Sequence, residues 1–349
     1  MRLASLVILA LMSLASPPAL AQQSPGEPQR LRLRMQTAFD PGLSVLGEGA
    51  RHFVNAVKAA SNGALALKIV EAGGRVPSAN LIDAVVGGDL DAGFTWPGHA
   101  AAKLPALSLF ASVPFGPSVE EYVGWMADGG GGALHRELYG RLGVHAMMCG
   151  VMGPEAGGWF RSEISSVADL KGLRVRFTGL AGEVLQRFGA EVVSVPSGDV
   201  FNKLQSGVLD GAEFSMPSVD RALGLDKLGM LYYFPGWHQP ASLVDFYMRK
   251  DKWEALSREQ RAQIEMACRS TVLFTMARAP AEQARALAYF RKQGISLRFW
   301  APSTLESFRE TAADVMREHA EKDADFRRVW DNMRQYLDGP RAWRRLSRP

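Results

Sequence analysis

Cysteine is scarce in this chain, and long apolar runs are missing after its first residues. Cys149 and Cys268 are the only cysteines among 349 residues, too few for a disulfide framework. The two thiols could pair in an oxidising compartment or lie apart as separate buried side chains, and both alternatives stay open. Because no second run of about 18 apolar residues occurs, we expect no membrane span after the N-terminal segment.

Neither sign of charge dominates the sequence. It has 40 Lys and Arg residues against 36 Asp and Glu, a formal net charge of +4. Such a small excess argues against a nucleic-acid-binding protein. Part of it lies in a basic tail, interpreted as a solvated end rather than a membrane-surface patch: Arg341, Arg344, Arg345 and Arg348.

The common catalytic motifs are also missing. The sequence contains no G-x-S-x-G, no G-x-x-x-x-G-K-[ST], no H-E-x-x-H and no C-x-x-C, and the glycine run at 129–132 does not complete G-x-G-x-x-G. None of the six histidines has metal-ligand spacing, so each is expected to be a structural or surface residue. These features favour binding over catalysis.

The N-terminus, in contrast, carries a clear signal. Met1 and Arg2 precede an apolar run at 3–15, and the small-x-small pattern at 19–21 comes just before polar residues. This layout predicts a secretory signal peptide at 1–21. Removing 21 residues from 349 leaves 328, enough for two domains. We expect the mature chain in a bacterial periplasm.

Strand and helix signals alternate after the signal peptide. Apolar periodicity predicts strand, helix, strand, helix, strand at residues 31–35, 44–60, 64–70, 80–86 and 91–96. A second series follows at residues 144–151, 174–177, 182–188, 191–195, 199–205 and 210–214. Two such units predict two similar α/β lobes, the first with a mostly parallel sheet.

Residues 253–293 contain few helix breakers and show helical apolar spacing. They predict a long helix spanning both lobes, kinked or split at Pro280. Strands at 232–234 and 243–248 precede it, and helices at 303–322 and 325–336 follow. The predicted fold class is α/β, with two lobes, a cleft between them, hinge strands and a spanning helix.

The predicted division of the chain has four parts. They are the signal peptide at 1–21, lobe I at 22–146 with a return segment near 240–252, lobe II at 147–239, and the spanning and C-terminal helices at 253–349, packed on both lobes.

Four segments carry a family resemblance. Residues 153–161 are G-P-E-A-G-G-W-F-R, 169–176 are D-L-K-G-L-R-V-R, 210–214 are D-G-A-E-F, and 232–239 are Y-Y-F-P-G-W-H-Q. Their order and spacing resemble the DctP-type periplasmic solute-binding subunits of TRAP (tripartite ATP-independent periplasmic) transporters. The first and last segments point to the subgroup that binds 2-oxo monocarboxylates or lactate. The resemblance covers nearly all of the mature chain and implies a periplasmic-binding-protein-like fold.

The resemblance implies that Arg176 clamps the substrate carboxylate. A guanidinium fork matches a carboxylate bidentately, and the pairing strengthens when it is desolvated. Arg174, two residues away, shares the same strand face and is the alternative for this role.

The resemblance also implies a hard cation, Na⁺ or Ca²⁺, that bridges the protein to the substrate. Its ligands correspond to Glu213, the backbone carbonyl of Phe214, and Gln239. Glu155 stands where relatives have Gln, and Gln239 stands where they have Glu, as though a carboxylate and an amide had exchanged places. We therefore count Glu155 and Phe214 among the substrate-binding residues.

The first lobe is expected to contribute a lid. Relatives carry tyrosines after the third strand, where this chain has Trp96, our first choice for a substrate contact, and Thr95, our second. The alternative is that Trp96 is a core aromatic residue. Trp159 and Trp237 are interpreted as packing walls of the site.

The leading hypothesis is a non-enzymatic receptor that closes on a small organic acid and docks on a membrane permease. The alternative is a periplasmic lyase or hydrolase that uses Glu155 and Glu213 as an acid/base pair. A signalling receptor domain is a third option. Members of the subgroup can dimerise through a long C-terminal helix, and the resemblance leaves a homodimer open here.

Overall fold

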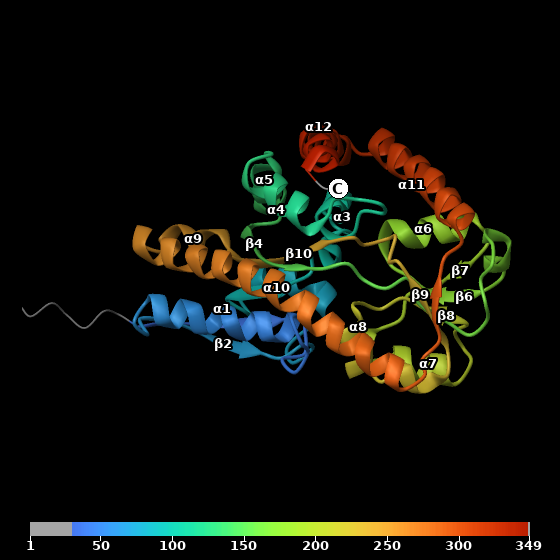
Figure 1. The fold of residues 1–349 in the computed structure, drawn as a ribbon. Coiled ribbons are helices and arrows are strands. Elements are labelled where there is room, and N and C mark those ends of the chain that lie inside the picture. The colour runs from blue at the N-terminus through green and yellow to red at the C-terminus, as the bar shows by residue number, and fades with distance from the viewer. Residues whose placement is uncertain (1–29, 348–349) are drawn as a thin grey trace, which may run out of the picture.

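Two β-sheets with helices around them make up residues 30–347, the part of the chain that the computed structural model describes (Figure 1). The signal peptide predicted at 1–21 lies outside these residues. Within the described range, no helix has the combination of length and apolar character that a membrane crossing requires.

The first sheet has five strands. In spatial order they are β2 (Leu65–Val70), β1 (Leu31–Thr37), β3 (Ala92–Thr95), β10 (Ser242–Arg249) and β4 (Val144–Met152). β1 pairs in parallel with β2 and β3, which confirms the parallel arrangement predicted for these three strands. β10, from the predicted return segment, lies antiparallel between β3 and β4. The lobe boundary predicted at 146/147 falls within β4.

The second sheet has six strands. In spatial order they are β11 (Leu297–Phe299), β9 (Leu231–Phe234), β5 (Gly158–Phe160), β8 (Gly211–Ala212), β6 (Arg174–Arg176) and β7 (Glu191–Val192). β6 is parallel to both β7 and β8, whereas β5 is antiparallel to β8 and β9. The carboxyl ends of β6 and β8 therefore lie side by side.

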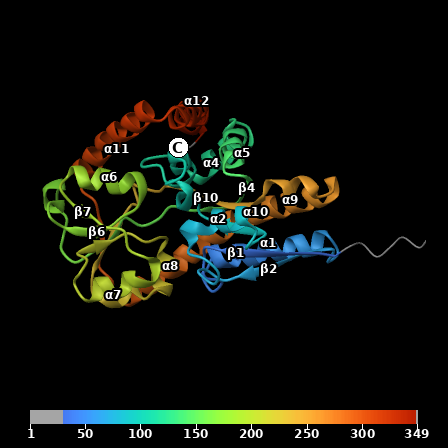
Figure 2. The ribbon, with the colours of Figure 1, turned by 180° about the vertical axis from the view of Figure 1, so that it is seen from behind.

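Helices cover both sheets, and Figure 2 shows the arrangement from behind. They are α1 (Leu46–Ala60), α2 (Leu81–Gly87), α3 (Ser108–Ala111), α4 (Val119–Ala127), α5 (Gly131–Arg141), α6 (Gly179–Arg187), α7 (Val200–Gln205), α8 (Pro217–Ala222), α9 (Lys250–Ala255), α10 (Arg258–Lys292), α11 (Pro302–Lys322) and α12 (Ala324–Ser347). The 3₁₀ helix η2 (Pro97–Ala100) directly follows β3. The α/β fold class predicted from the sequence is confirmed.

Helix α10 extends across both sheets (Figure 1). It begins at a capping box, in which the Ser257 hydroxyl accepts from the Gln260 backbone amide and the Gln260 side chain accepts from the Ser257 amide. The sequence predicted one helix from residue 253, but Ser257 separates α10 from α9. Pro280 lies inside α10 and does not split it. The prediction of a spanning helix is confirmed.

A disulfide joins Cys149 of β4 to Cys268 of α10, and both residues are buried. The structure thereby decides between the two cysteine alternatives that the sequence left open. Seven residues further along α10, the Thr275 hydroxyl accepts a hydrogen bond from the backbone amide of Val151 at 3.0 Å. These contacts attach the first part of α10 to β4.

Aromatic packing joins helices to both sheets. Phe53 of α1 packs against Phe246 of β10, with ring centroids 4.8 Å apart. In the second sheet, Trp159 of β5 stacks on Tyr232 of β9 at 3.9 Å, and Phe290 of α10 meets Trp159 edge-on at 5.9 Å. Such buried contacts fix α1 against β10 of the first sheet and α10 against β5 of the second.

Candidate functional site

The candidate site forms where the carboxyl ends of β6 and β8 meet two connecting segments of the chain. Arg176 is the last residue of β6, and it pairs in register with Ala212 of β8. Glu213 directly follows β8. Glu155 lies in the segment between β4 and β5, and His238 in the segment between β9 and β10. The side chains therefore meet because of the sheet topology and not because of their spacing in the sequence.

Arg176 is held by its neighbour across the two strands. The guanidinium donates from Nη1 to the backbone carbonyl of Glu213 and, at 3.3 Å, to Oε2 of the same residue. Its carbon Cζ lies 5.1 Å from the centroid of the Phe214 ring. The side chain is only 12% exposed, and its buried Nε has no hydrogen-bond partner among the described residues.

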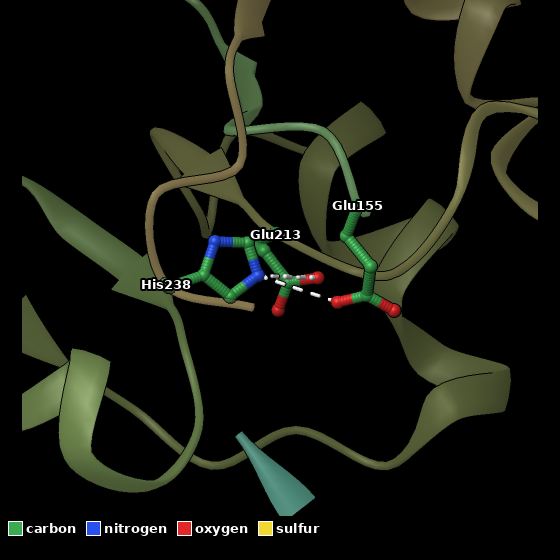
Figure 3. Close-up of side chains that lie close together, drawn as sticks. All are labelled: Glu155, Glu213 and His238. Carbon is green, nitrogen blue, oxygen red and sulfur yellow. Dashed lines mark hydrogen bonds and ion pairs between the residues drawn. The ribbon is translucent and has the colours of Figure 1, made fainter. Parts of the chain in front are cut away.

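Glu155, Glu213 and His238 form a compact cluster, shown in Figure 3. His238 Nε2 lies 3.3 Å from Glu155 Oε2 and 3.5 Å from Glu213 Oε1. All three residues are at least nine-tenths buried. We call these three side chains the carboxylate–imidazole cluster.

Burial and mutual charge set the protonation of this cluster. Burial raises the pKa of Glu155 to about 7, and the charge of Glu213 acts in the same direction. Burial also opposes ionisation of Glu213, but His238 and Arg176 outweigh it and keep the pKa of Glu213 below its usual range. Burial alone would lower the pKa of His238, yet the charges of Glu213 and Glu155 raise it to about 9.

Backbone contacts lock the loops that carry the cluster. The Glu155 amide donates to the Gln239 carbonyl at 3.2 Å, and the Gly236 amide donates to the Glu155 carbonyl at 3.1 Å. A Cβ at Gly236 would lie 2.3 Å from that carbonyl oxygen, so only glycine fits there. From the first lobe, the Ser112 hydroxyl donates to the His238 carbonyl at 2.9 Å.

Two predicted contacts from the first lobe, Thr95 and Trp96, are joined through His99 in η2. The Thr95 hydroxyl lies 2.9 Å from His99 Nδ1, and the Trp96 ring meets His99 edge-on at 5.4 Å. The Trp96 indole donates to the Ser242 hydroxyl at 2.9 Å. Burial and then the charge of Arg176 lower the pKa of His99 to about 4. His99 is therefore neutral at physiological pH and within electrostatic range of Arg176; ligand contacts by Thr95 and Trp96 stay predictions.

The structure thus brings together most of the predicted site. Arg176, Glu155, Glu213 and Phe214 lie in one cluster, and the backbone of Gln239, itself buried, is hydrogen-bonded to Glu155. The other arginine considered, Arg174, is exposed and paired with Glu191.

The two tryptophans interpreted as walls are packing residues. Trp159 is fully buried, and its indole donates to Asp220 of α8 at 2.8 Å. Trp237 stacks on Phe115 at 5.7 Å.

Sequence reasoning missed two histidines of this region. His238 has no ligand-like spacing to Glu155 or Glu213, because each comes from a different loop. The expectation of a structural or surface residue did not specify its surroundings, and the structure places it between two buried carboxylates. Its place within the P-G-W-x-x segment was the one available signal. His99 follows the predicted lid residues closely, and that proximity was its only signal.

A separate pocket of about 1070 Å³ runs along α10. Apolar side chains of α10, β9 and β11 line much of it, with Met276 and Phe299 among them. Of the predicted site residues, only Glu155 borders this pocket. The pocket therefore adjoins the Arg176 cluster at Glu155 but is not lined by Arg176, Glu213 or His238.

The donor set beside Arg176 fits a cation. Two buried carboxylates lie close together, and Glu213 Oε1 accepts no hydrogen bond among the described residues. Carboxylate oxygens are the groups that Na⁺ and Ca²⁺ prefer, and a cation between them would offset their repulsion. Glu155 and Glu213 would hold such an ion.

Comparison with known proteins gives consistent matches. The family model of bacterial extracellular solute-binding proteins, family 7 (DctP), matches residues 38–323. The monocarboxylate 2-oxoacid-binding periplasmic protein of Nostoc sp. is 32% identical over 317 residues, which cover 91% of this chain and 87% of the relative.

Solved structures of solute-binding proteins have a similar fold. A TRAP transporter solute-binding protein of Bordetella bronchiseptica, a mixed-occupancy dimer with calcium and picolinate bound in one site, has a TM-score of 0.88 at 28% identity and covers 91% of this chain and 95% of its own. A TRAP solute-binding protein of Pseudoalteromonas atlantica with bound sodium and pyruvate has a TM-score of 0.86 at 26% identity and covers 91% and 97%.

Proposed function

The chain belongs to the bacterial extracellular solute-binding proteins of family 7, and from this premise we propose that it is the periplasmic receptor of a TRAP transporter for a small organic acid. The substrate class is a 2-oxo or 2-hydroxy monocarboxylate. The receptor releases it to a membrane permease that uses an ion gradient. The signal-like residues 1–21 support a periplasmic location.

The unpaired edge of Arg176 carries the proposal. Nη1 is engaged by Glu213, whereas the buried Nε has no hydrogen-bond partner within residues 30–347. Nε and Nη2 form the side of a guanidinium that binds a carboxylate through two parallel hydrogen bonds. A buried donor without a partner is costly, so an incoming carboxylate at this edge would satisfy it. The guanidinium is thereby prepared for an anion before the anion arrives.

A cation beside the acid completes the proposed site. Glu213, the carbonyl of Phe214 and Gln239 are the ligands expected from the resemblance, and the buried Glu155 lies next to them. An acid with oxygens on adjacent carbons offers two ligand atoms to such an ion. Calcium or sodium lies with the organic acid in the two solved relatives described above, which supports this arrangement.

Family membership decides between receptor and enzyme. The family is one of solute-binding proteins, which supports a role for Glu155 and Glu213 in binding rather than as the acid/base pair of a lyase or hydrolase. Among the described residues, both carboxylates also face His238 or Arg176, which engages them in charge pairing.

Calorimetry with untagged protein tests the proposal. Pyruvate, 2-oxobutyrate and lactate are titrated against the chelator-treated protein, with and without added Ca²⁺ or Na⁺, and acetate serves as the acid without a 2-oxygen. We expect tight binding of at least one 2-oxo or 2-hydroxy acid, weaker binding of acetate, and unchanged acid by NMR after incubation. Failure of all three acids to bind, or conversion of any of them, would contradict the proposal.

A further inference from the structure

We propose that Glu48 and Arg278 are positioning residues for binding of the organic acid, because together they hold a strained turn at Val45 in the shape that packs against the second half of the molecule. The inference rests on the proposed function, since binding of the acid is the process that it concerns. Neither side chain is part of the site described above, and neither is expected to touch the acid. Both would act through the turn that precedes α1.

The backbone of this turn is unusual. Val45 has φ 66° and ψ −60°, and the Leu46 amide donates to the Ser44 carbonyl at 2.7 Å. These features define the rarer and strained form of the γ-turn. A β-branched residue is an outlier in this region of backbone conformation. Val45 is also fully buried, so its surroundings must hold it in the strained shape.

Glu48, in the first turn of α1, holds Val45 and is itself held by α10. Its Oε2 atom accepts from the Val45 amide at 3.2 Å and from Arg278 Nε at 2.9 Å, while Oε1 accepts from Arg278 Nη2 at 3.0 Å. A carboxylate bound by both arms of a guanidinium is fixed in position as well as in charge. The Glu48–Arg278 pair therefore ties the strained turn to the spanning helix.

The start of α1 is also packed tightly by backbone contacts. A Cβ at Gly47 would lie 2.1 Å from the carbonyl oxygen of Asp40, so the loop after β1 presses directly on the helix. A Cβ at Gly49 would lie 3.1 Å from Cγ2 of Thr275 in α10. Close approach to both the loop and α10 leaves the turn little room to move while the pair is intact.

The segment that leads to the turn runs beside the predicted acid contacts of the first sheet. Thr37, the last residue of β1, pairs in register with Phe94 of β3, and the Ala38 amide donates to the Phe94 carbonyl at 2.9 Å. The next residues of β3 and its loop are Thr95 and Trp96. Ligands of α/β sheets bind at the carboxyl ends of the strands. A displaced turn would therefore disturb this edge of the first sheet.

Val45 belongs to an apolar cluster that extends from the first sheet towards the second. The cluster includes Ala279 of α10 and Val219 of α8, which follows β8 of the second sheet. Phe214, whose ring lies beside the Arg176 guanidinium, packs against the same cluster. In its strained shape the turn thus contributes to the packing between the first sheet and the surroundings of Arg176.

The strain and the ion pair act in opposite directions. Without the Glu48–Arg278 pair, Val45 could return to an ordinary backbone conformation, and its side chain would leave the apolar cluster. The contacts to the acid would be unchanged, but the two halves of the molecule would no longer be held in the arrangement that binds it. Affinity would fall because ordering them would add to the cost of binding.

Two substitutions of Val45 test the strain without any acid. Val45→Ala and Val45→Gly both remove most of the buried side chain, but only glycine adopts a positive φ without cost. We expect Val45→Gly to unfold at a higher urea concentration than Val45→Ala, the reverse of the usual order of these two residues. A lower unfolding midpoint for Val45→Gly would overturn the proposal.

Calorimetry tests the pair, with whichever of pyruvate, 2-oxobutyrate and lactate binds the wild-type protein most tightly. Glu48→Ala and Arg278→Ala should each weaken binding by roughly 2- to 30-fold, and the double variant should lose no more than the larger single effect. The matched control is Glu282→Gln, because Glu282 also pairs with Arg278, at 3.2 Å, but is not bonded to the turn. All variants are measured at a temperature at which circular dichroism shows them folded.

A combined variant separates positioning from a purely structural role. In the Val45→Gly protein, Glu48→Ala should cause almost no further loss of affinity, because glycine keeps the turn without the ion pair. Additive losses, or wild-type affinity in Glu48→Ala and Arg278→Ala, would overturn this inference and leave the receptor function intact. Failure of the wild-type protein to bind any of the three acids would instead contradict the proposed function, and this inference with it.

Discussion

Arg176 and Glu213 bind each other through both backbone and side chain. The Glu213 amide donates to the Arg176 carbonyl at 3.0 Å, while the Arg176 guanidinium donates to the carbonyl and carboxylate of Glu213. Neighbouring parallel strands thus position the guanidinium from two directions. Because one edge is used in this way, the other edge is fixed in space as well, which lowers the entropy cost of binding a ligand there.

Substitution of Arg176 should separate it from Arg174. Arg176→Ala should weaken binding of the organic acid by about 2–5 kcal/mol, because a buried carboxylate loses its partner. Arg176→Lys should lose less, since the charge remains but the two-point contact does not. Arg174→Ala is the control on the same strand face and should leave affinity unchanged by calorimetry. The reverse order of effects would assign the clamp to Arg174.

The Cys149–Cys268 disulfide closes a sequence separation of 119 residues. Replacing both residues by alanine should lower the free energy of unfolding by about 2–5 kcal/mol, measured by urea denaturation. The reducing agent dithiothreitol should bring the wild-type protein to the stability of the variant and leave the variant unaffected. Acid affinity should not change, since the disulfide joins β4 and α10 within the first lobe. Equal stability of the oxidised wild-type protein and the variant would contradict this.

Asp91 should make stability depend on pH at the acid end. Burial alone would raise its pKa, but Lys252 at 2.5 Å and the Arg34 amide at 2.7 Å outweigh burial and keep the pKa below the usual 3.8. Its stabilisation is therefore complete above the unfolded-state pKa and is lost as pH falls through the folded-state pKa. Asp91→Asn should flatten the fall in stability measured by denaturation between about pH 5 and pH 3. Asp89→Asn, at an exposed site, should keep the wild-type slope.

Gly236 should be essential for the position of Glu155. A Cβ there would lie 2.3 Å from the Glu155 carbonyl, so Gly236→Ala must displace this backbone and should cost about 1–3 kcal/mol of stability. We also expect a loss of acid affinity of at least tenfold, roughly. The control is Gly140→Ala in α5, where a Cβ has open space. This substitution should raise the free energy of unfolding by about 0.5–1 kcal/mol. Wild-type affinity in Gly236→Ala would show that the Glu155 loop tolerates displacement.

Trp96 and Ser242 offer a test of the predicted lid contact. Trp96→Phe removes the hydrogen bond to Ser242 and part of the ring, whereas Ser242→Ala removes only the hydrogen bond. If the indole contacts the acid, Trp96→Phe should lower affinity more than Ser242→Ala in calorimetry. Equal losses would instead assign Trp96 to positioning of the lid.

Local patterning predicts much of the fold. Alternation in residues 31–35 and helical spacing in residues 253–293 correspond to β1 and to α9 with α10. Of the kink or split predicted at Pro280, the split is wrong: α10 continues through this residue, because packing on both sheets outweighs one lost hydrogen bond. The insertion of β10 between β3 and β4 depends on pairing between distant segments, which periodicity does not encode.

The site was predictable only through motif resemblance. Arg176, Glu213 and Glu155 were found because short segments around them match a family pattern. The sequence did not identify His238 as a site residue, because its charge pairing involves Glu155 and Glu213. These residues are 83 and 25 positions away in the sequence and lie in other loops. Its charge interactions exist only once both sheets have formed.

Pro280 leaves one rung missing in the hydrogen-bond ladder of α10, since it has no amide to donate to the carbonyl of Met276. Cys268 fastens the helix to β4 before this point, and Phe290 anchors it in the second sheet after it. Helix α10 is thus held at two points, one in each sheet, and is least constrained between them. Flexure of the molecule would concentrate at that rung, so one half could swing while both anchored ends stay packed.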